Sequence, residues 1–384
     1  MQKLYGKRIF KKAVDGPVQL TIAIALALCA ISCGDGIQGR GDGPDTAGKS
    51  VVVSPDDLYR QGITFSESGD RGKAIACFAG AIALRPGFSE AHLRLGLMKL
   101  SEKRYSVARS DLGKAITLLY ADTGKYMRQG FADLRRGYYT GTAENLRKAE
   151  AGGTALAEAY RGRAVCGLHL DERAAALRDM NMAVGFSQRD AASYSIRGLC
   201  LYMAGRERDA FRNLQRAIEL KRDCFEAFYI RAAMFASLGR MDEAIRDLTS
   251  VLALNSEYSM AYYNRGVLHG KSGRFQREIE DYTRALKFDA HFIDALYNRG
   301  LAFYRKGMFR KALKDFSEAV KSSPRDADAV FNRAMAHACM GNGEDTLLDI
   351  TKAMKINPLK SDFYNRREEP CPGRDVQFDL VNLL

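Results

Sequence analysis

Two neighbouring stretches decide the fold of this chain: residues 259–292, SMAYYNRGVLHGKSGRFQREIEDYTRALKFDAHF, and residues 293–326, IDALYNRGLAFYRKGMFRKALKDFSEAVKSSPRD. Aligned without a gap, both carry Tyr-Asn-Arg-Gly at positions 5–8, Gly at position 15, Asp at position 23 and Ala at position 27. The same 34-residue unit starts at residues 55, 89, 123, 157, 191, 225, 259, 293 and 327. Its eighth residue is always Gly or Ala, so the body of the chain is one repeat used nine times.

The spacing within a repeat predicts two antiparallel helices. Positions 4, 7, 8 and 11 share one face of a first helix, and positions 20, 24 and 27 share one face of a second. Gly near position 15 ends the first helix and turns the chain. Small residues at positions 8, 20 and 27 let the two helices approach closely. One helix pair cannot bury its own apolar face, so neighbouring repeats must stack. We therefore expect an all-α solenoid.

The period and pattern resemble the tetratricopeptide repeat. The first-helix signature of that family appears as Tyr262-Tyr263-Asn264-Arg265-Gly266 and as Leu296-Tyr297-Asn298-Arg299-Gly300. The closing proline of the family motif is kept only at residues 86, 324 and 358. The resemblance covers residues 55–360 and implies nine helix-turn-helix repeats in a right-handed superhelix. It also implies a concave groove, lined by the first helices, that binds protein or peptide segments.

The N-terminus has the composition of an export signal. A lysine-rich start is followed by an apolar run of 14 residues, Val18 to Ile31, which is too short to span a bilayer. The run ends in Ala30-Ile31-Ser32-Cys33, which resembles a bacterial lipoprotein signal and implies lipidation of Cys33. Simple secretion and an uncleaved anchor are the alternatives. We expect an exported protein, anchored in the membrane of a bacterial cell envelope and facing the periplasm.

The remaining segments complete the predicted organisation. Residues 1–32 are the signal, and residues 33–54, with six Gly, form a flexible tether. Residues 361–384 form a capping half-helix and tail. The third repeat, residues 123–156, is the least regular, because Asp133 occupies a normally apolar position and Gly152-Gly153 interrupts its end. It is either a hinge or a degenerate repeat.

Six successive repeats carry Arg at position 7 and an acid or amide at position 23. These positions face each other across the helix pair, so the residues are expected to form structural braces within each repeat. The alternative is a ladder of arginines that binds anions. The predicted pairs are Arg163–Asp179, Arg197–Asn213, Arg231–Asp247, Arg265–Asp281, Arg299–Asp315 and Arg333–Asp349.

Positions 5 and 6 of the first helices are the candidate ligand groove. Stacked aromatic rings beside a row of amides suit an extended peptide, because amides can pair with its backbone. Common family residues without a ligand are the alternative. In the first three repeats position 6 is Arg, at residues 60, 94 and 128, which forms either a more basic groove segment or a solvated row of charge. The candidate groove residues are Tyr229, Tyr263, Asn264, Tyr297, Asn298, Phe331 and Asn332.

Several function classes lack support in the sequence. We find no phosphate-binding loop, no serine nucleophile motif and no metal-ligand spacing, so we expect no enzyme activity, no metal and no cofactor. The net charge of +13 favours an anionic partner. An alternative function is therefore electrostatic binding of lipid head groups or wall polymer through basic outer faces. Nucleic acid conflicts with an export signal. The sequence thus favours an exported interaction scaffold.

Overall fold

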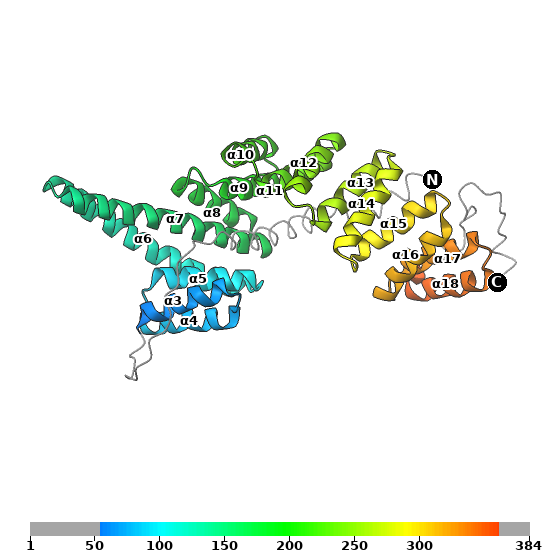
Figure 1. Ribbon diagram of the computed structural model, residues 1–384, viewed down its shortest axis with the longest axis horizontal. Helices are drawn as coiled ribbons and strands as arrows, with labels where there is room; N and C mark the ends of the chain where they lie inside the picture. The colour runs from blue at the N-terminus through cyan, green and yellow to red at the C-terminus, as the bar shows by residue number, and fades with distance from the viewer. Residues whose placement is uncertain (1–53, 361–384) are drawn as a thin grey trace. The chain divides into compact units, whose positions relative to one another are not determined.

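The computed structural model describes residues 54–360, and every regular element in that range is a helix. The chain divides into two compact bodies, which meet at residues 233 and 234. We call them the N-terminal body and the C-terminal body and describe each by itself (Figure 1). The predicted signal, Cys33, the tether and the capping segment lie outside the described residues. The all-α solenoid of paired helices is confirmed.

Consecutive helices pair along the chain in both bodies. The N-terminal body contains α3 (Pro55–Glu67), α4 (Arg71–Leu84), α5 (Ser89–Ser101), α6 (Tyr105–Arg135), α7 (Tyr139–His169), α8 (Arg173–Phe186), α9 (Ala191–Met203) and α10 (Glu207–Leu220). Helix α11 (Phe225–Ser237) crosses the division between the bodies. The C-terminal body contains α12 (Met241–Leu254), α13 (Ser259–Lys271), α14 (Phe275–Phe288), α15 (Ile293–Arg305), α16 (Phe309–Ser322), α17 (Ala327–Cys339), α18 (Gly343–Ile356) and a 3-10 turn (Pro358–Lys360).

The turn inside each repeat has a left-handed residue at position 15. Glycine provides it in seven repeats, for example Gly273 and Gly307, both at φ 71°. The two repeats without glycine keep the same geometry with Lys103 at φ 62° and Asp171 at φ 59°. This conformation costs a residue with a side chain about 1–2 kcal/mol, so packing of the helix pair must enforce it there.

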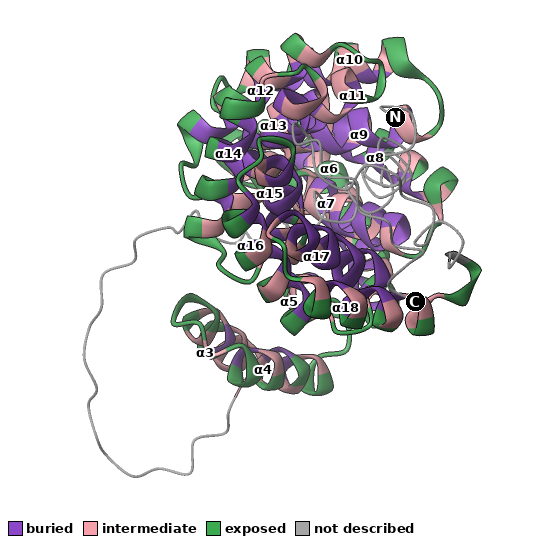
Figure 2. Ribbon diagram, turned by 90° about the vertical axis from the view of Figure 1, so that its right-hand side faces the viewer, coloured by how far each residue is buried: buried purple, intermediate pink, exposed green. Residues whose placement is uncertain are grey.

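The core of each repeat is closed by a ring or an aliphatic chain that lies over a small residue. A Cβ atom placed on Gly300 of α15 would lie 2.7 Å from Cε1 of Phe316 in α16. Phe316 is fully buried. Where position 8 is Ala, position 24 is aliphatic and not a ring, as with Ala334 and Ile350. Figure 2 shows the buried residues gathered where paired helices face each other.

We expect Gly300→Ala to destabilise the C-terminal body, because the added methyl group overlaps the Phe316 ring. Overpacking of this kind costs about 1–3 kcal/mol. Urea denaturation followed by circular dichroism measures the effect. The double variant with Phe316→Met, which copies the pairing of Ala164 with Met180, should recover most of the loss. Full stability of the single variant would show that the contact can relax.

The third repeat is not a separate helix pair. Its first helix continues the second helix of repeat two in α6, and its second helix continues into the first helix of repeat four in α7. Both fused helices are 31 residues long. The two junctions contain Ala121, Ala155 and Ala157 and no proline. The interruption expected at Gly152-Gly153 does not occur, because α7 continues through both glycines. Gly137, at φ 75°, still turns the chain between α6 and α7.

The fourth repeat stacks directly on the second. In the C-terminal body, Nη1 of the position-7 arginine donates to position 25 of the preceding repeat, as Arg265 does to Oγ1 of Thr249 at 3.1 Å. In the fourth repeat, Nη1 of Arg163 instead lies 4.0 Å from a Cβ atom built on Gly113, which is position 25 of repeat two. A Cβ atom built on Gly162 would likewise lie 3.1 Å from Cδ1 of Leu112, also in repeat two.

Two further contacts show the same skipped register. The rings of Tyr105 and His169 stack with centroids 4.0 Å apart, and Arg109 pairs with Glu172. All four residues belong to repeats two and four. The third repeat is therefore a two-helix hairpin left out of the stack, and α6 and α7 run side by side away from the other helices of the N-terminal body (Figure 1). The sequence left open a hinge or a degenerate repeat here, and it did not predict the skipped register.

Candidate protein-interaction site

The candidate groove residues of the C-terminal body form a ladder of hydrogen bonds between repeats. Asn298 in α15 donates from Nδ2 to the hydroxyl oxygen of Tyr263 in α13, at 2.9 Å. Asn332 in α17 repeats the contact with Tyr297 in α15, at 2.8 Å. Residues 35 apart are thus joined twice with the same geometry. We call this arrangement the Tyr–Asn ladder.

The ladder changes what the amides can offer a ligand. Nδ2 of Asn332 also donates to the carbonyl oxygen of Asp328, so both of its hydrogens serve the protein. Asn298 and Asn332 are only 6% and 7% exposed. Neither amide oxygen hydrogen-bonds to another described residue, so an acceptor remains on each rung. The sequence-based interpretation expected each amide to pair with a peptide backbone as donor and acceptor. At Asn332, only the acceptor is left for a ligand.

The aromatic members of the row are buried to different degrees. The Tyr263 ring packs against Phe292 with centroids 4.8 Å apart, and Phe331 is 2% exposed. Burial raises the pKa of Tyr263 well above its usual value, so its hydroxyl stays protonated and neutral. Tyr263 and Tyr297 keep a part of their surface accessible. Of these three rings, only those of Tyr263 and Tyr297 therefore have surface that a ligand can contact.

Two predicted groove residues lie on either side of the division between the bodies. Tyr229 belongs to α11 of the N-terminal body, where it is 2% exposed and stacks on Phe225. Asn264 belongs to α13 of the C-terminal body. Because the bodies are described separately, a continuous row from Tyr229 to Phe331 stays a prediction.

The position-7 arginines meet their position-23 partners in every pair that lies within one body. Each arginine–aspartate pair has two hydrogen bonds, from Nε and Nη2 to the two carboxylate oxygens, with distances of 2.6–2.9 Å. The carboxylates are buried, with exposed fractions of 3–8%. Bidentate geometry of this kind makes the pairs strong and specific. The pairs are Arg163–Asp179, Arg265–Asp281, Arg299–Asp315 and Arg333–Asp349.

The fifth repeat shows what the carboxylate contributes. Arg197 donates to the amide oxygen of Asn213 at 2.7 Å, and burial lowers the pKa of Arg197. By contrast, the hydrogen bonds that Arg163 donates to Asp179 raise the pKa of Arg163. An amide thus positions the guanidinium without neutralising it. The two residues of the remaining predicted pair, Arg231 and Asp247, belong to different bodies, so this pair stays a prediction.

We expect Asn213→Asp to stabilise the N-terminal body, because a carboxylate would neutralise the charge of Arg197. The free energy of unfolding should rise by about 1 kcal/mol. The rise is smaller than a charged hydrogen bond alone would give, because the substitution also removes the hydrogen bond from the Asn213 amide to the Asp209 carbonyl oxygen. Chemical denaturation at pH 7 measures it, with Asn145→Asp, beside the acidic Asp133, as the destabilising counterpart. Lower stability of Asn213→Asp would show that the lost amide donor outweighs the charge.

Earlier repeats fill the same location with different chemistry. In repeat two the cation comes from position 11, where Lys99 donates to Asp111 at 2.7 Å. In repeat three the acid itself is at position 11, and Asp133 accepts from Gln129 and Asn145, both at 2.9 Å. The unusual Asp133 is therefore the repeat's buried polar centre. Each of these repeats therefore keeps a buried polar contact between its two helices, although the residues that form the contact differ from those of the later repeats.

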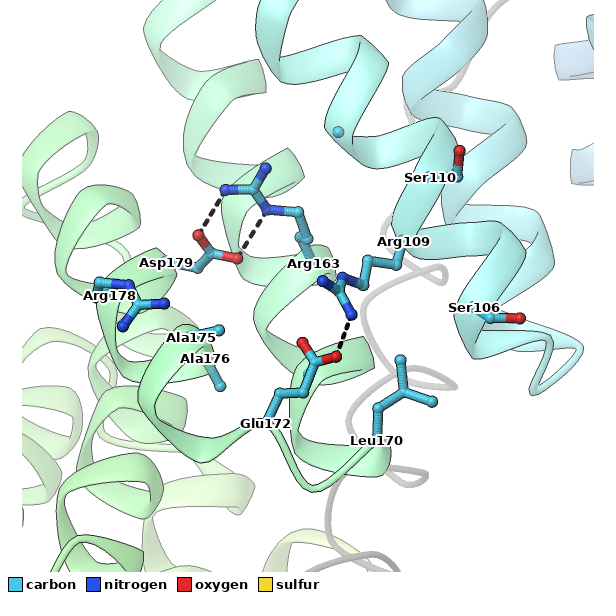
Figure 3. Close-up of a pocket in the computed structure, with 12 residues that line it drawn as sticks. Ser106, Arg109, Ser110, Arg163, Leu170, Glu172, Ala175, Ala176, Arg178 and Asp179 are labelled. Atoms are coloured by element: carbon cyan, nitrogen blue, oxygen red, sulfur yellow. Dashed lines mark hydrogen bonds and ion pairs between the residues drawn. The ribbon is translucent and has the colours of Figure 1, made fainter.

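A cavity of about 500 Å³, lined by both apolar and polar residues, lies between α6, α7 and α8 of the N-terminal body (Figure 3). Its two acids are both used, since Asp179 accepts from Arg163 and Glu172 pairs with Arg109. Arg178 is exposed and forms no ion pair with any described residue. Ser106 and Ser110 complete the polar lining. The cavity lining thus contains Arg178, which has no ion-pair partner among the described residues, and two serine hydroxyl groups.

Within residues 54–360 we find no cluster of three potential metal ligands. None of the helices in this range is both long and apolar enough to cross a bilayer. The sequence patterns also missed one surface: the hairpin of the third repeat exposes Met127, Phe131 and Leu134. The available signal was the absence of proline from the junctions at both ends of that repeat.

Two family models described as tetratricopeptide repeat match the chain, one at residues 293–326 and the other at residues 59–122, 197–248 and 238–291. The matched ranges leave out residues 123–196, which hold most of the projecting hairpin and the repeat that follows it. No curated protein matches the chain significantly.

Solved structures of similar fold include YrrB, described as a tetratricopeptide-repeat protein with an unusual peptide-binding site. It is 22% identical, over 47% of this chain and 92% of that one, with a TM-score of 0.43. PilF from Pseudomonas aeruginosa is 12% identical over 56% and 98% of the two chains, with a TM-score of 0.50. A tetratricopeptide repeat protein from Parabacteroides merdae is 16% identical over 70% and 93%, with a TM-score of 0.48. With its repeats and paired helices, the chain belongs to the tetratricopeptide-repeat proteins, which generally serve as protein-interaction scaffolds.

Proposed function

We propose that this protein is an exported, lipid-anchored scaffold of a bacterial cell envelope that faces the periplasm and binds protein or peptide segments in its concave groove. The export signal, Cys33 and the Gly-rich tether support the location. The repeat family supports the kind of partner. A catalytic role is not part of the proposal, because signal, tether, repeats and cap account for the whole sequence.

The Tyr–Asn ladder is the observation that carries the groove. Hydrogen bonds from Asn298 to Tyr263 and from Asn332 to Tyr297 fix the side chains before any ligand arrives. Fixed side chains lose little conformational entropy on binding, which favours affinity. Each rung keeps an amide oxygen that can accept from a peptide N–H group. Rungs on successive repeats suit an extended segment better than a small molecule.

Photo-crosslinking in intact cells tests the groove. A benzoylphenylalanine at position 263 or 297 should capture the same protein from both sites. The matched control is position 318 in α16, where Glu318 is exposed. Capture of the same set of abundant proteins from all three positions would contradict binding at the ladder.

Fractionation tests the anchor separately. Cys33→Ala should move the protein from the membrane fraction to the soluble fraction, because the lipidated thiol is lost. Cys77→Ala, at a partly buried free cysteine of α4, is the control and should stay with the membrane. Membrane retention of both variants would favour an uncleaved anchor, and release of the unaltered protein would favour simple secretion.

Electrostatic binding of anionic envelope components is the second candidate. The observation that favours it is the cavity with Arg178, which has no described acidic partner and lies beside Ser106 and Ser110. An electrostatic complex should weaken steeply between low and high salt. Binding of anionic vesicles or wall polymer that depends on salt and is lost in Arg178→Gln would support this function. Salt-independent binding would contradict it.

A further inference from the structure

The projecting hairpin carries an apolar row that no described part of the protein covers. Met127, Phe131 and Leu134 are spaced by four and three residues, so they share one face of α6. Their exposed fractions are 38%, 50% and 46%. We call these three residues the hairpin stripe. Seven residues of helix span about 10 Å, so the stripe is two helical turns long.

The stripe occupies positions 5, 9 and 12 of its repeat. In several other repeats, positions 9 and 12 are buried and the following first helix packs alongside, as α17 does on α15. Buried residues at these two positions, in repeats that a described first helix follows, are Leu100, Val165, Leu168, Leu199, Val267, Leu301 and Tyr304. Repeat four, which should cover repeat three, stacks on repeat two instead. The stripe is thus a repeat-packing face that has lost its covering helix.

On α6, the exposed charges beside the stripe have one sign. Among residues 123–140 the exposed charged residues are Lys125, Arg128, Arg135 and Arg136. The single acid of this segment, Asp133, is buried between the two helices and accepts from two amides. Arg128 and Arg135 are seven residues apart, so they lie along one edge of the stripe. The stripe is therefore apolar with a cationic border.

We propose that an amphipathic helix of a partner protein, with acidic side chains beside its apolar face, docks on the hairpin stripe. A helix is the element that covers these positions elsewhere in the chain, and acidic flanks complement Arg128 and Arg135. A second copy of this chain would bring the same cations together, which repulsion disfavours. The stripe belongs to the N-terminal body and the ladder to the C-terminal body, so either site can fail without the other.

Two synthetic 18-residue helices are the probes. Both carry leucine at i, i+3, i+4 and i+7, and their flanking residues are glutamate in one and lysine in the other. Fluorescence anisotropy with the full chain should show the glutamate peptide binding at least about tenfold more tightly, a difference of the size that paired charges give. The double variant Arg128→Glu/Arg135→Glu should reverse the preference, and it alters only exposed side chains.

A second variant tests the apolar contact. Phe131→Asp should weaken binding of the glutamate peptide by at least about tenfold, because burial of the ring is lost. Leu348→Asp, at a leucine of α18 that is 67% exposed, is the control and should bind normally. Equal binding of both peptides, or none, would overturn the proposal. So would binding of phosphatidylglycerol vesicles in place of the peptides, or a dimer that Phe131→Asp dissolves.

Discussion

Replacing Arg299 by Met should lower the free energy of unfolding of the C-terminal body by about 3 kcal/mol, because it leaves the Asp315 carboxylate buried and unpaired. Asp315 is 3% exposed and accepts two hydrogen bonds from Arg299, at 2.7 and 2.8 Å. The guanidinium also donates to Thr283 of the preceding repeat, at 3.3 Å. The substitution therefore removes a brace within one repeat and a contact between two.

Urea denaturation at pH 7 measures the loss. Arg310→Met, at an exposed arginine of α16, is the matched control and should change stability by less than about 0.5 kcal/mol. The double variant Arg299→Met/Asp315→Leu should regain stability, since an apolar pair can replace a buried ion pair. If Arg299→Met left stability unchanged and abolished binding of an anionic ligand, the arginines would be a binding ladder and not braces.

Removing residues 123–156 should leave the stack of the N-terminal body intact. The deletion takes out one whole repeat, and the contacts of Tyr105 with His169 and of Arg109 with Glu172 do not involve it. Leu119 and Ala157, which lie on either side of the deleted segment, are both buried, so closing the chain there keeps an apolar junction. The midpoint of thermal unfolding should change by no more than about 4 °C.

The matched control is removal of residues 157–190, a deletion of the same length. It removes Arg163, Leu168 and Asp179, which are buried in or brace the stack. We expect a much larger fall in the unfolding midpoint, because the interface with repeat two is lost. Calorimetry of both deletions distinguishes the two cases. Equal loss of stability in both would show that the third repeat supports the stack after all.

The local rules of the fold could be predicted from the sequence. Gly300 opposite Phe316 and Arg299 opposite Asp315 follow from spacing within 34 residues, and each contact repeats with the period. Lys103 and Asp171 show that even a turn without its expected glycine keeps its geometry. Short-range spacing predicts such contacts because both partners lie in one helix pair.

The candidate groove was predicted only in part. The row of Tyr and Asn residues was visible in the sequence, but the bonds from Asn298 to Tyr263 and from Asn332 to Tyr297 join different repeats. Their geometry depends on how far one repeat is displaced from the next, which a pattern inside one repeat does not contain. The same holds for the cavity between α6, α7 and α8, whose walls come from repeats two and four.

The sequence by itself determined the repeat, its helix pairs and the pairs of polar residues that close them, because all of these are set by contacts within 34 residues. Only the tertiary structure decided which repeats stack. Ala121 and Ala155 allow α6 and α7 to continue through their junctions, and the third repeat then leaves the stack as a hairpin. That outcome depends on which arrangement buries more apolar surface: a regular stack, or continuous helices with repeat four in contact with repeat two. Because this compares whole arrangements of the chain, no pattern within one repeat can decide it.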